Sequence, residues 1–166
     1  MQPDALNELK QAAIINTLRM CQLFAGSPPA DLKNIADIAV VKVLAKGGYL
    51  FREGEVSHGF YIVQKGAVNV HRVNAAGKEQ IIHVFRPGES FAEATLATET
   101  GYPADARAIE PTQVLLVKKI DFVARLKRQP ELALRMLGSM SQHLRVLVGL
   151  LEDLTLKDVE TRLANW

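Results

Sequence analysis

Cysteine is almost absent from this sequence, because its 166 residues include only Cys21. A single cysteine cannot close a disulfide within the chain. Nor can it hold an iron–sulfur cluster by itself, since such clusters need several cysteine ligands. We interpret Cys21 as a small buried hydrophobic residue. The composition therefore argues against disulfide-rich and iron–sulfur proteins.

Long apolar runs and a strong charge of one sign are lacking as well. No run reaches the length of about 18 apolar residues that a membrane-spanning helix requires. Residues 1–10 do not show the basic and then apolar pattern of a signal peptide. The net charge of +2 is too small to indicate nucleic-acid binding by this segment. We expect a cytoplasmic protein without membrane contact.

Motifs of common enzyme classes are absent from the sequence. It contains no Gly-x-Ser-x-Gly, Walker loop, His-Glu-x-x-His or paired-cysteine spacing. Glu93, Asp105 and Arg107 could be combined into a site on paper, but no spacing favours them. A metal-binding β-barrel would show clustered His and Glu ligands, whereas the four histidines are scattered. We predict that the protein is not an enzyme.

The middle of the chain consists of short strand-like segments with turn signals at even spacing. From residue 40 to residue 118 the apolar pattern has a period of two, and glycines at 54, 66, 77 and 88 interrupt it every 11 or 12 residues. This spacing is typical of a β-sandwich, barrel or roll. The predicted strands are 41–44, 49–52, 60–63, 68–71, 80–85 and 112–117.

Helical patterns flank this β region on both sides. Helices are predicted over 4–20, 31–38 and 120–128 and from 131 onwards. In the last helix, apolar residues recur at alternating steps of three and four, which forms a heptad seam and favours a homodimer. The alternative is a helix that packs on its own sheet through a broader apolar stripe. The seam residues are Leu137, Met140, Leu144, Leu147, Leu151 and Leu154.

One carboxylate, Glu93, lies among small and apolar residues shortly after a Pro87-Gly88 turn. Burying a carboxylate is costly unless a donor group satisfies it. Two interpretations follow. Either backbone N–H groups or a nearby arginine hold Glu93, or the carboxylate faces a ligand cavity.

Three motifs, in this order, resemble the Crp/Fnr superfamily of bacterial transcription regulators. They are Gly48–Glu55, Phe60–Val68 and Pro87–Glu93. The resemblance extends over residues 20–166 and implies a mixed α+β fold. Its core would be an antiparallel β-roll of jelly-roll, cyclic-nucleotide-binding type, with flanking N-terminal helices and a long C-terminal dimerisation helix.

The resemblance also implies a division of the chain. Residues 1–128 would form the effector-sensing domain with its N-terminal helices, and residues 129–158 the long dimerisation helix. Residues 159–166 look like the start of a helix-turn-helix DNA-binding domain, the remainder of which would follow Trp166. A cyclic-nucleotide-binding module of a channel or scaffold protein is the alternative, but the long seam argues against it.

The residues that hold cyclic AMP in this superfamily are largely replaced here. In members that bind cyclic AMP, an Arg and a Ser after the Glu hold the phosphate, and Pro103 and Ala104 take those positions. A Thr and a Ser of the long helix contact the adenine there, and Leu147 and Val148 replace them. Glu93 alone would keep its role, a ribose contact. Losing the phosphate partners costs about 4–6 kcal/mol, roughly 10³ to 10⁴ in affinity, so we do not expect cyclic AMP as the effector.

A largely apolar effector is the remaining expectation. Phe91–Ala94 and His58–Tyr61 resemble the dissimilatory nitrate respiration regulators, which respond to nitric oxide and are thought to use haem. Haem is therefore a candidate, and a halogenated aromatic effector or an empty cavity are alternatives. His143 and His83 are the candidate haem ligands, whereas we expect His58 to bond the backbone and His71 to be solvated. The expected pocket comprises Phe91, Ala92, Glu93, Pro103, Ala104, Leu147, Val148 and the nearest cation, Arg107, in the following strand.

The mechanism that the resemblance implies has two states. An effector bound between the β-roll and the long helix would change how two long helices pack, and this change would reorient the DNA-binding domains. The expected partners are a second copy of the chain, a small-molecule effector, and DNA through the C-terminal domain.

Overall fold

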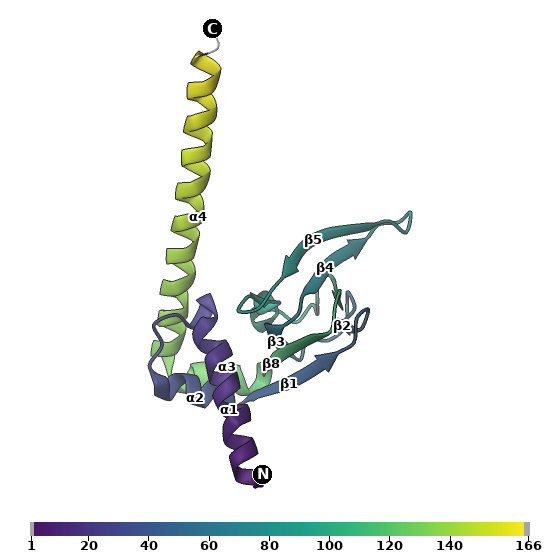
Figure 1. Ribbon diagram of the computed structural model, residues 1–166, viewed down its shortest axis with the longest axis vertical. Helices are drawn as coiled ribbons and strands as arrows, with labels where there is room; N and C mark the ends of the chain where they lie inside the picture. The colour runs from purple at the N-terminus through teal and green to yellow at the C-terminus, as the bar shows by residue number, and fades with distance from the viewer. Residues whose placement is uncertain (1, 165–166) are drawn as a thin grey trace.

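A computed structural model describes residues 2–164, without the side chains of residues 143, 146, 147 and 154–164. Two four-stranded sheets form a β-roll, short helices lie at one end of it, and a long helix rises beside it (Figure 1). The predicted mixed α+β fold with an antiparallel roll is confirmed. Among the described residues, no helix is long and apolar enough to span a membrane.

The chain passes repeatedly from one sheet to the other, except that the consecutive strands β4 and β5 pair in the same sheet, and every pair of neighbouring strands is antiparallel. The order in the first sheet is β1 (Ala39–Leu44), β8 (Thr112–Lys118), β3 (Gly59–Lys65) and β6 (Ser90–Phe91). The order in the second is β2 (Tyr49–Phe51), β7 (Asp105–Ala108), β4 (Val68–Val73) and β5 (Glu79–Phe85). The six predicted strands are confirmed. The two-residue strand β6 was not predicted because it is too short to show a period.

Strands β3 and β8 are buried on both faces because each separates two hydrophobic cores. In β3, Phe60 and Ile62 pack against the helices, whereas Tyr61 and Val63 point into the roll. β8 alternates in the same way, with Leu115 and Val117 toward the helices and Val114 and Leu116 toward the roll interior.

Three of the helices begin at a proline, which presets φ for the first turn and lacks an N–H that would be unpaired there. They are α1 (Pro3–Met20), α2 (Pro29–Asp37) and α4 (Pro130–Ala164). The 3₁₀ helix η1 (Gln22–Phe24) and helix α3 (Lys119–Arg128) complete this layer, while the 3₁₀ helix η2 (Glu93–Ala97) follows β6. The four predicted helices are thus confirmed to within two residues at their starts.

The predicted turn glycines have the backbone conformation that favours glycine. Gly54, Gly66, Gly77 and Gly88 all have φ between 80° and 88°. Gly66 is also sterically required, since a Cβ there would lie 2.4 Å from Thr112 Oγ1. These turns follow β2, β3, β4 and β5 and fix where these four strands end.

The contacts that the structure describes for helix α4 anchor it at its base. Leu132 and Met136 are buried in the helical core. The buried Asp31 of α2 accepts a hydrogen bond from Gln129 Nε2 at 2.9 Å and pairs with Arg135 of α4. Beyond this point the predicted seam is exposed in the single chain, with Leu137 60% and Leu144 61% exposed. The side chains of Leu147 and Leu154 lie outside the described residues, so the seam as a whole remains a prediction.

Candidate ligand-binding cleft

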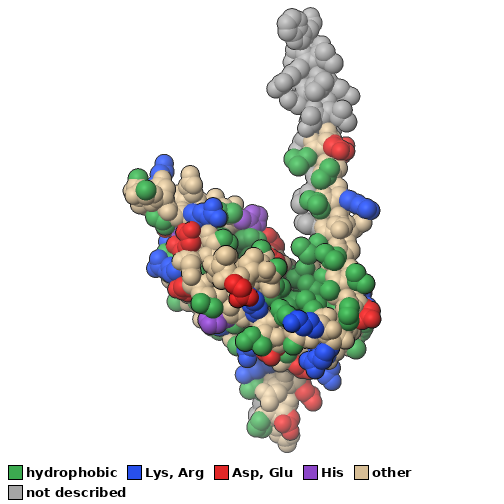
Figure 2. Space-filling model, turned by 180° about the vertical axis from the view of Figure 1, so that it is seen from behind, with side chains coloured by type: hydrophobic (Ala, Val, Ile, Leu, Met, Phe, Trp, Pro, Cys, Tyr) green, Lys and Arg blue, Asp and Glu red, His purple; other side chains and the backbone are tan. Residues whose placement is uncertain are grey.

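A cleft of about 750 Å³ lies between the β-roll and α4. Figure 2 shows hydrophobic side chains gathered in the hollow where the long helix meets the roll. Three segments line it: the end of α1 with η1, the loop between β5 and η2, and one face of α4. The lining residues are Met20, Gln22, Leu23, Phe85, Pro87, Gly88, Glu89, Ser90, Glu93, Leu137, Met140, Ser141 and Leu144.

The loop after β5 is held rigidly against β3. The N–H of Gly88 donates to the Val63 carbonyl at 2.8 Å, and the Val63 N–H donates to the Glu89 carbonyl at 3.0 Å. Ala92 has φ 68°, a left-handed conformation that costs a non-glycine residue about 1–2 kcal/mol. The Thr95 hydroxyl donates to the Ala92 carbonyl at 2.7 Å and stabilises this bend. Glu93 therefore enters the cleft from a strained but well-supported turn.

Glu93 is half-buried and has no hydrogen bond or ion pair with the residues that the structure describes. Its charge acts on the buried thiol of Cys21. Burial is the main cause that raises the pKa of Cys21, the Glu93 carboxylate raises it further, and hydrogen bonds involving Leu23 and Ser90 oppose this. Of the two interpretations of Glu93, the structure supports a carboxylate that faces a cavity.

A second carboxylate, Glu89, lines the same cleft but has partners. Its Oε2 lies 3.1 Å from His83 Nε2, and its Oε1 accepts a hydrogen bond from the Arg86 N–H. The His83 side chain is 54% exposed on strand β5 and is not part of the cleft lining. His143, the other candidate haem ligand, has a side chain outside the described residues.

The structure brings few of the expected pocket residues together, and among those with described side chains only Glu93 lines the cleft. Phe91 and Ala92 pack in or against the interior of the roll. Pro103 is exposed, its carbonyl accepts a hydrogen bond from Arg72 Nε, and Ala104 is buried away from the cleft. Val148 is exposed on α4 beyond the lining residues, and Leu147 has no described side chain.

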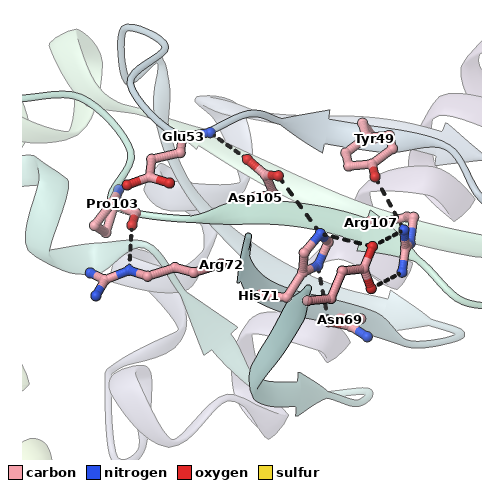
Figure 3. A network of polar contacts seen from close by, with 9 residues as sticks. Tyr49, Glu53, Asn69, His71, Arg72, Pro103, Asp105 and Arg107 are labelled. Atoms are coloured by element: carbon pink, nitrogen blue, oxygen red, sulfur yellow. Dashed lines mark hydrogen bonds and ion pairs between the residues drawn. The ribbon is translucent and has the colours of Figure 1, made fainter. Parts of the chain in front are cut away.

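Arg107 lies on the face of β7 that points away from the roll interior, because its neighbour Ala106 packs into that interior. Its guanidinium donates to both carboxylate oxygens of Glu79, at 2.8 and 2.9 Å, and to the Tyr49 hydroxyl at 3.1 Å. The pair lowers the pKa of Glu79 and raises that of Arg107. The structure thus places Arg107 in a polar network beside Tyr49 (Figure 3), and Arg107 is not among the residues that line the cleft.

His71 was predicted to be solvated, and this prediction is wrong because its side chain is fully buried. Its Nδ1 lies 3.1 Å from Asn69 Oδ1 (Figure 3). Its Nε2 lies 3.7 Å from Asp105 and 3.8 Å from Glu79, without a hydrogen bond to a described residue. Side chains from β5 and β7 surround the ring, which a local pattern cannot indicate. In the described part of the chain, no cluster of three or more His, Cys, Asp or Glu could hold a metal ion.

The interior of the roll is filled by aromatic rings. Phe51 stacks on Tyr102 with ring centroids 3.7 Å apart, and Phe91 stacks with Tyr61 at 5.5 Å and with Phe85 at 4.9 Å. Burial also raises the pKa of Tyr61. The cleft therefore lies at the edge of the roll toward α4 and outside this filled interior, and Phe85 belongs to both the aromatic core and the cleft.

The sequence predictions did not include most of the lining residues. Met20, Leu23 and Phe85 come from segments that meet only in the folded chain, so no local motif connects them. Leu137, Met140 and Leu144 were identified as seam residues, and their spacing was the one available signal that this face of α4 has a function.

The chain matches known proteins along most of its length. Residues 41–129 match the family model described as "Cyclic nucleotide-binding domain". The Cyclic AMP receptor protein of Thermus thermophilus is 27% identical over 142 residues, which cover 86% of this chain and 66% of that protein. The Transcriptional activator protein anr of Pseudomonas aeruginosa is 30% identical over 125 residues, covering 74% of this chain and 50% of the relative.

A solved structure matches over a similar part of the chain. The sensor domain of the transcriptional regulator DNR from Pseudomonas aeruginosa superposes with a TM-score of 0.70 at 30% identity, and the match covers 84% of this chain and 93% of that domain. The chain thus spans half to two thirds of the curated regulators but nearly all of an isolated sensor domain.

Proposed function

The chain belongs to the cyclic nucleotide-binding domain family, in the form found in Crp/Fnr-type transcription regulators, and on that basis we propose that it senses an effector and dimerises. In the whole regulator it would pass the signal to a DNA-binding domain that follows residue 158, in the cytoplasm. The proposed activity is ligand binding and its transmission, without catalysis.

One observation carries this proposal: the effector cleft and the dimer seam share residues. Leu137, Met140 and Leu144 line the cleft, and the same three residues belong to the seam at helical steps of three and four. A helix surface that contacts both a ligand and a second helix couples the two binding events.

The coupling suggests a two-state mechanism. A ligand in the cleft contacts the fixed loop around Ser90 on one side and Met140 of α4 on the other. Because the buried and hydrogen-bonded contacts described for α4 lie between Leu132 and Ser139, a change at the cleft would alter the direction of the exposed part of the helix. Two such helices in a dimer would then move the domains that follow them.

The proposed effector is not cyclic AMP. A cyclic phosphate needs a cation or several donors, and no Lys or Arg is among the described residues that line the cleft. Arg107 is paired with Glu79 on the other face of its sheet. The aromatic filling of the roll also leaves the apolar cleft beside α4 as the place for a ligand.

Haem is a second candidate, supported by the sequence resemblance and by the apolar lining. The described lining opposes it, because the cleft holds two carboxylates and no histidine, and His83 is engaged with Glu89 at the surface. A haem titration decides whether haem is the effector. A saturable one-to-one Soret spectrum that His143→Ala shifts and His83→Ala does not would establish haem as the effector. A spectrum equal to that of haem mixed with serum albumin would exclude haem.

A neutral apolar dye, phenylnaphthylamine, tests the cleft itself by its fluorescence. We expect saturable binding that Met20→Glu weakens by about tenfold or more, because the variant places a charge in an apolar lining. Leu9→Glu is the matched control, since Leu9 is exposed on the same helix but away from the cleft. Equal effects of the two variants, or no binding to the wild type, would contradict the proposed site.

A further inference from the structure

The cleft that the proposed function uses has a charge of one sign. Glu89 and Glu93 are its charged lining residues, and no Lys or Arg stands among the described residues around them. Arg86 lies between two lining residues but is exposed and does not join them. The open space between the roll and α4 is therefore acidic as well as apolar.

The two carboxylates differ in how far the protein already satisfies them. Glu89 has His83 and the Arg86 N–H as partners at its two oxygens. Glu93 has no such partner among the described residues, although it is half-buried next to apolar side chains. A carboxylate in that position is costly without a donor, and its interaction with a positive charge is stronger than in water.

The backbone geometry shows that this placement is built into the fold. The left-handed Ala92 directs the chain into η2 at the point where Glu93 begins, and Thr95 bonds back to the Ala92 carbonyl. Glu93 is also close enough to the Cys21 thiol for its charge to act there. The carboxylate is thus held in the cleft lining close to Cys21, the residue that follows α1.

We infer that the effector is an amine with an apolar body, whose ammonium group pairs with Glu93 while its hydrocarbon part packs against Leu137, Met140 and Leu144. This inference rests on the proposed function, since it names the ligand class of the same cleft. Anionic ligands of similar shape are rejected because they would place a like charge near Glu89 and Glu93 without a compensating cation.

Three probes with the same apolar body and different head groups test this charge preference at pH 7. They are phenylbutylamine, phenylbutanol and phenylbutyrate, titrated into the full chain and followed by amide shifts in NMR spectra. We expect shifts at Ser90 and Leu137, with the amine binding at least about tenfold more tightly than the alcohol, which is 1.4 kcal/mol. Phenylbutyrate should bind most weakly.

Glu93→Gln separates the carboxylate from the rest of the cleft. The variant should reduce amine binding to the level of the alcohol and leave alcohol binding unchanged. Glu99→Gln is the control, because that carboxylate is 99% exposed and outside the cleft. Equal affinity for all three probes, or an amine preference that survives Glu93→Gln, would overturn the inference and leave the apolar cleft intact. Absence of binding by every probe would overturn the proposed function itself.

Discussion

At the scale of single residues, the two faces of the second sheet have different roles. The inner face contributes Phe51 and Val68 to the aromatic core of the roll. The outer face carries a polar network in which Arg107 binds Glu79 and the buried His71 lies between two carboxylates. The residue that sequence reasoning assigned to the ligand, Arg107, therefore stabilises the sheet.

The Arg107–Glu79 pair makes stability depend on pH. The guanidinium holds the pKa of Glu79 below its ordinary value of 4.5 in the folded chain. The stability that the pair contributes is therefore present above that value and is lost as the pH falls through the lower folded-state pKa. We expect Glu79→Gln to lower the urea midpoint at pH 7, and the difference from wild type to shrink as the pH falls below 4.5.

Glu110→Gln provides the control for that measurement, since Glu110 is exposed and its side chain has no ion pair within the described part of the chain. A difference between wild type and Glu79→Gln that stays constant from neutral to acidic pH would contradict the role given to Arg107.

At the scale of elements, α4 is positioned by a small polar contact at its base. Asp31 is buried and meets both Gln129 and Arg135, and the Ser139 hydroxyl donates to the Ala25 carbonyl at 3.1 Å. These contacts join α4 to α2 and to the loop before it. Their removal should loosen the helix that forms one wall of the cleft.

Asp31→Ala should lower the free energy of unfolding by about 1–3 kcal/mol, because Arg135 and Gln129 lose their acceptor. A double-mutant cycle with Arg135→Ala, measured by urea unfolding, isolates the pair. The two changes should be clearly less than additive. Additive effects would show that the pair does not hold α4 to α2.

The elements were predictable where periodicity is strong, and their mutual placement was not. The short apolar runs of β3 and β8 between turn signals and the helical spacing in α4 are local patterns, so they indicated the correct structure. Which face of a strand points inward is a tertiary property, and this explains why His71 is buried against the prediction and why Arg107 contacts Glu79 in this structure. The lining of the cleft by Met20 and Phe85 likewise depends on how α1 and β5 meet.

At the scale of the whole molecule, the exposed seam of α4 predicts a homodimer. Each buried seam side chain contributes about 1.5–3 kcal/mol, and several of them together match an association cost of about 4–15 kcal/mol. Leu144 is 61% exposed in the single chain, which leaves its apolar surface available to a partner.

Sedimentation of wild type and variants at micromolar concentration tests the dimer. Leu144→Lys or Leu151→Glu should give monomers, because each places a charge in the apolar seam. Gln142→Lys is the matched control, since position 142 lies on the opposite side of the heptad and should leave the dimer intact. A monomeric wild type would contradict the prediction.

We expect this nucleotide-binding-type fold to respond to a ligand other than cyclic AMP. Isothermal titration with cyclic AMP checks this expectation, with the Thermus thermophilus Cyclic AMP receptor protein as the positive control. The lack of a phosphate partner in the cleft predicts a dissociation constant no tighter than about millimolar for this chain. A micromolar constant, abolished by Arg107→Ala, would show that Arg107 leaves Glu79 to bind the phosphate and would contradict the account.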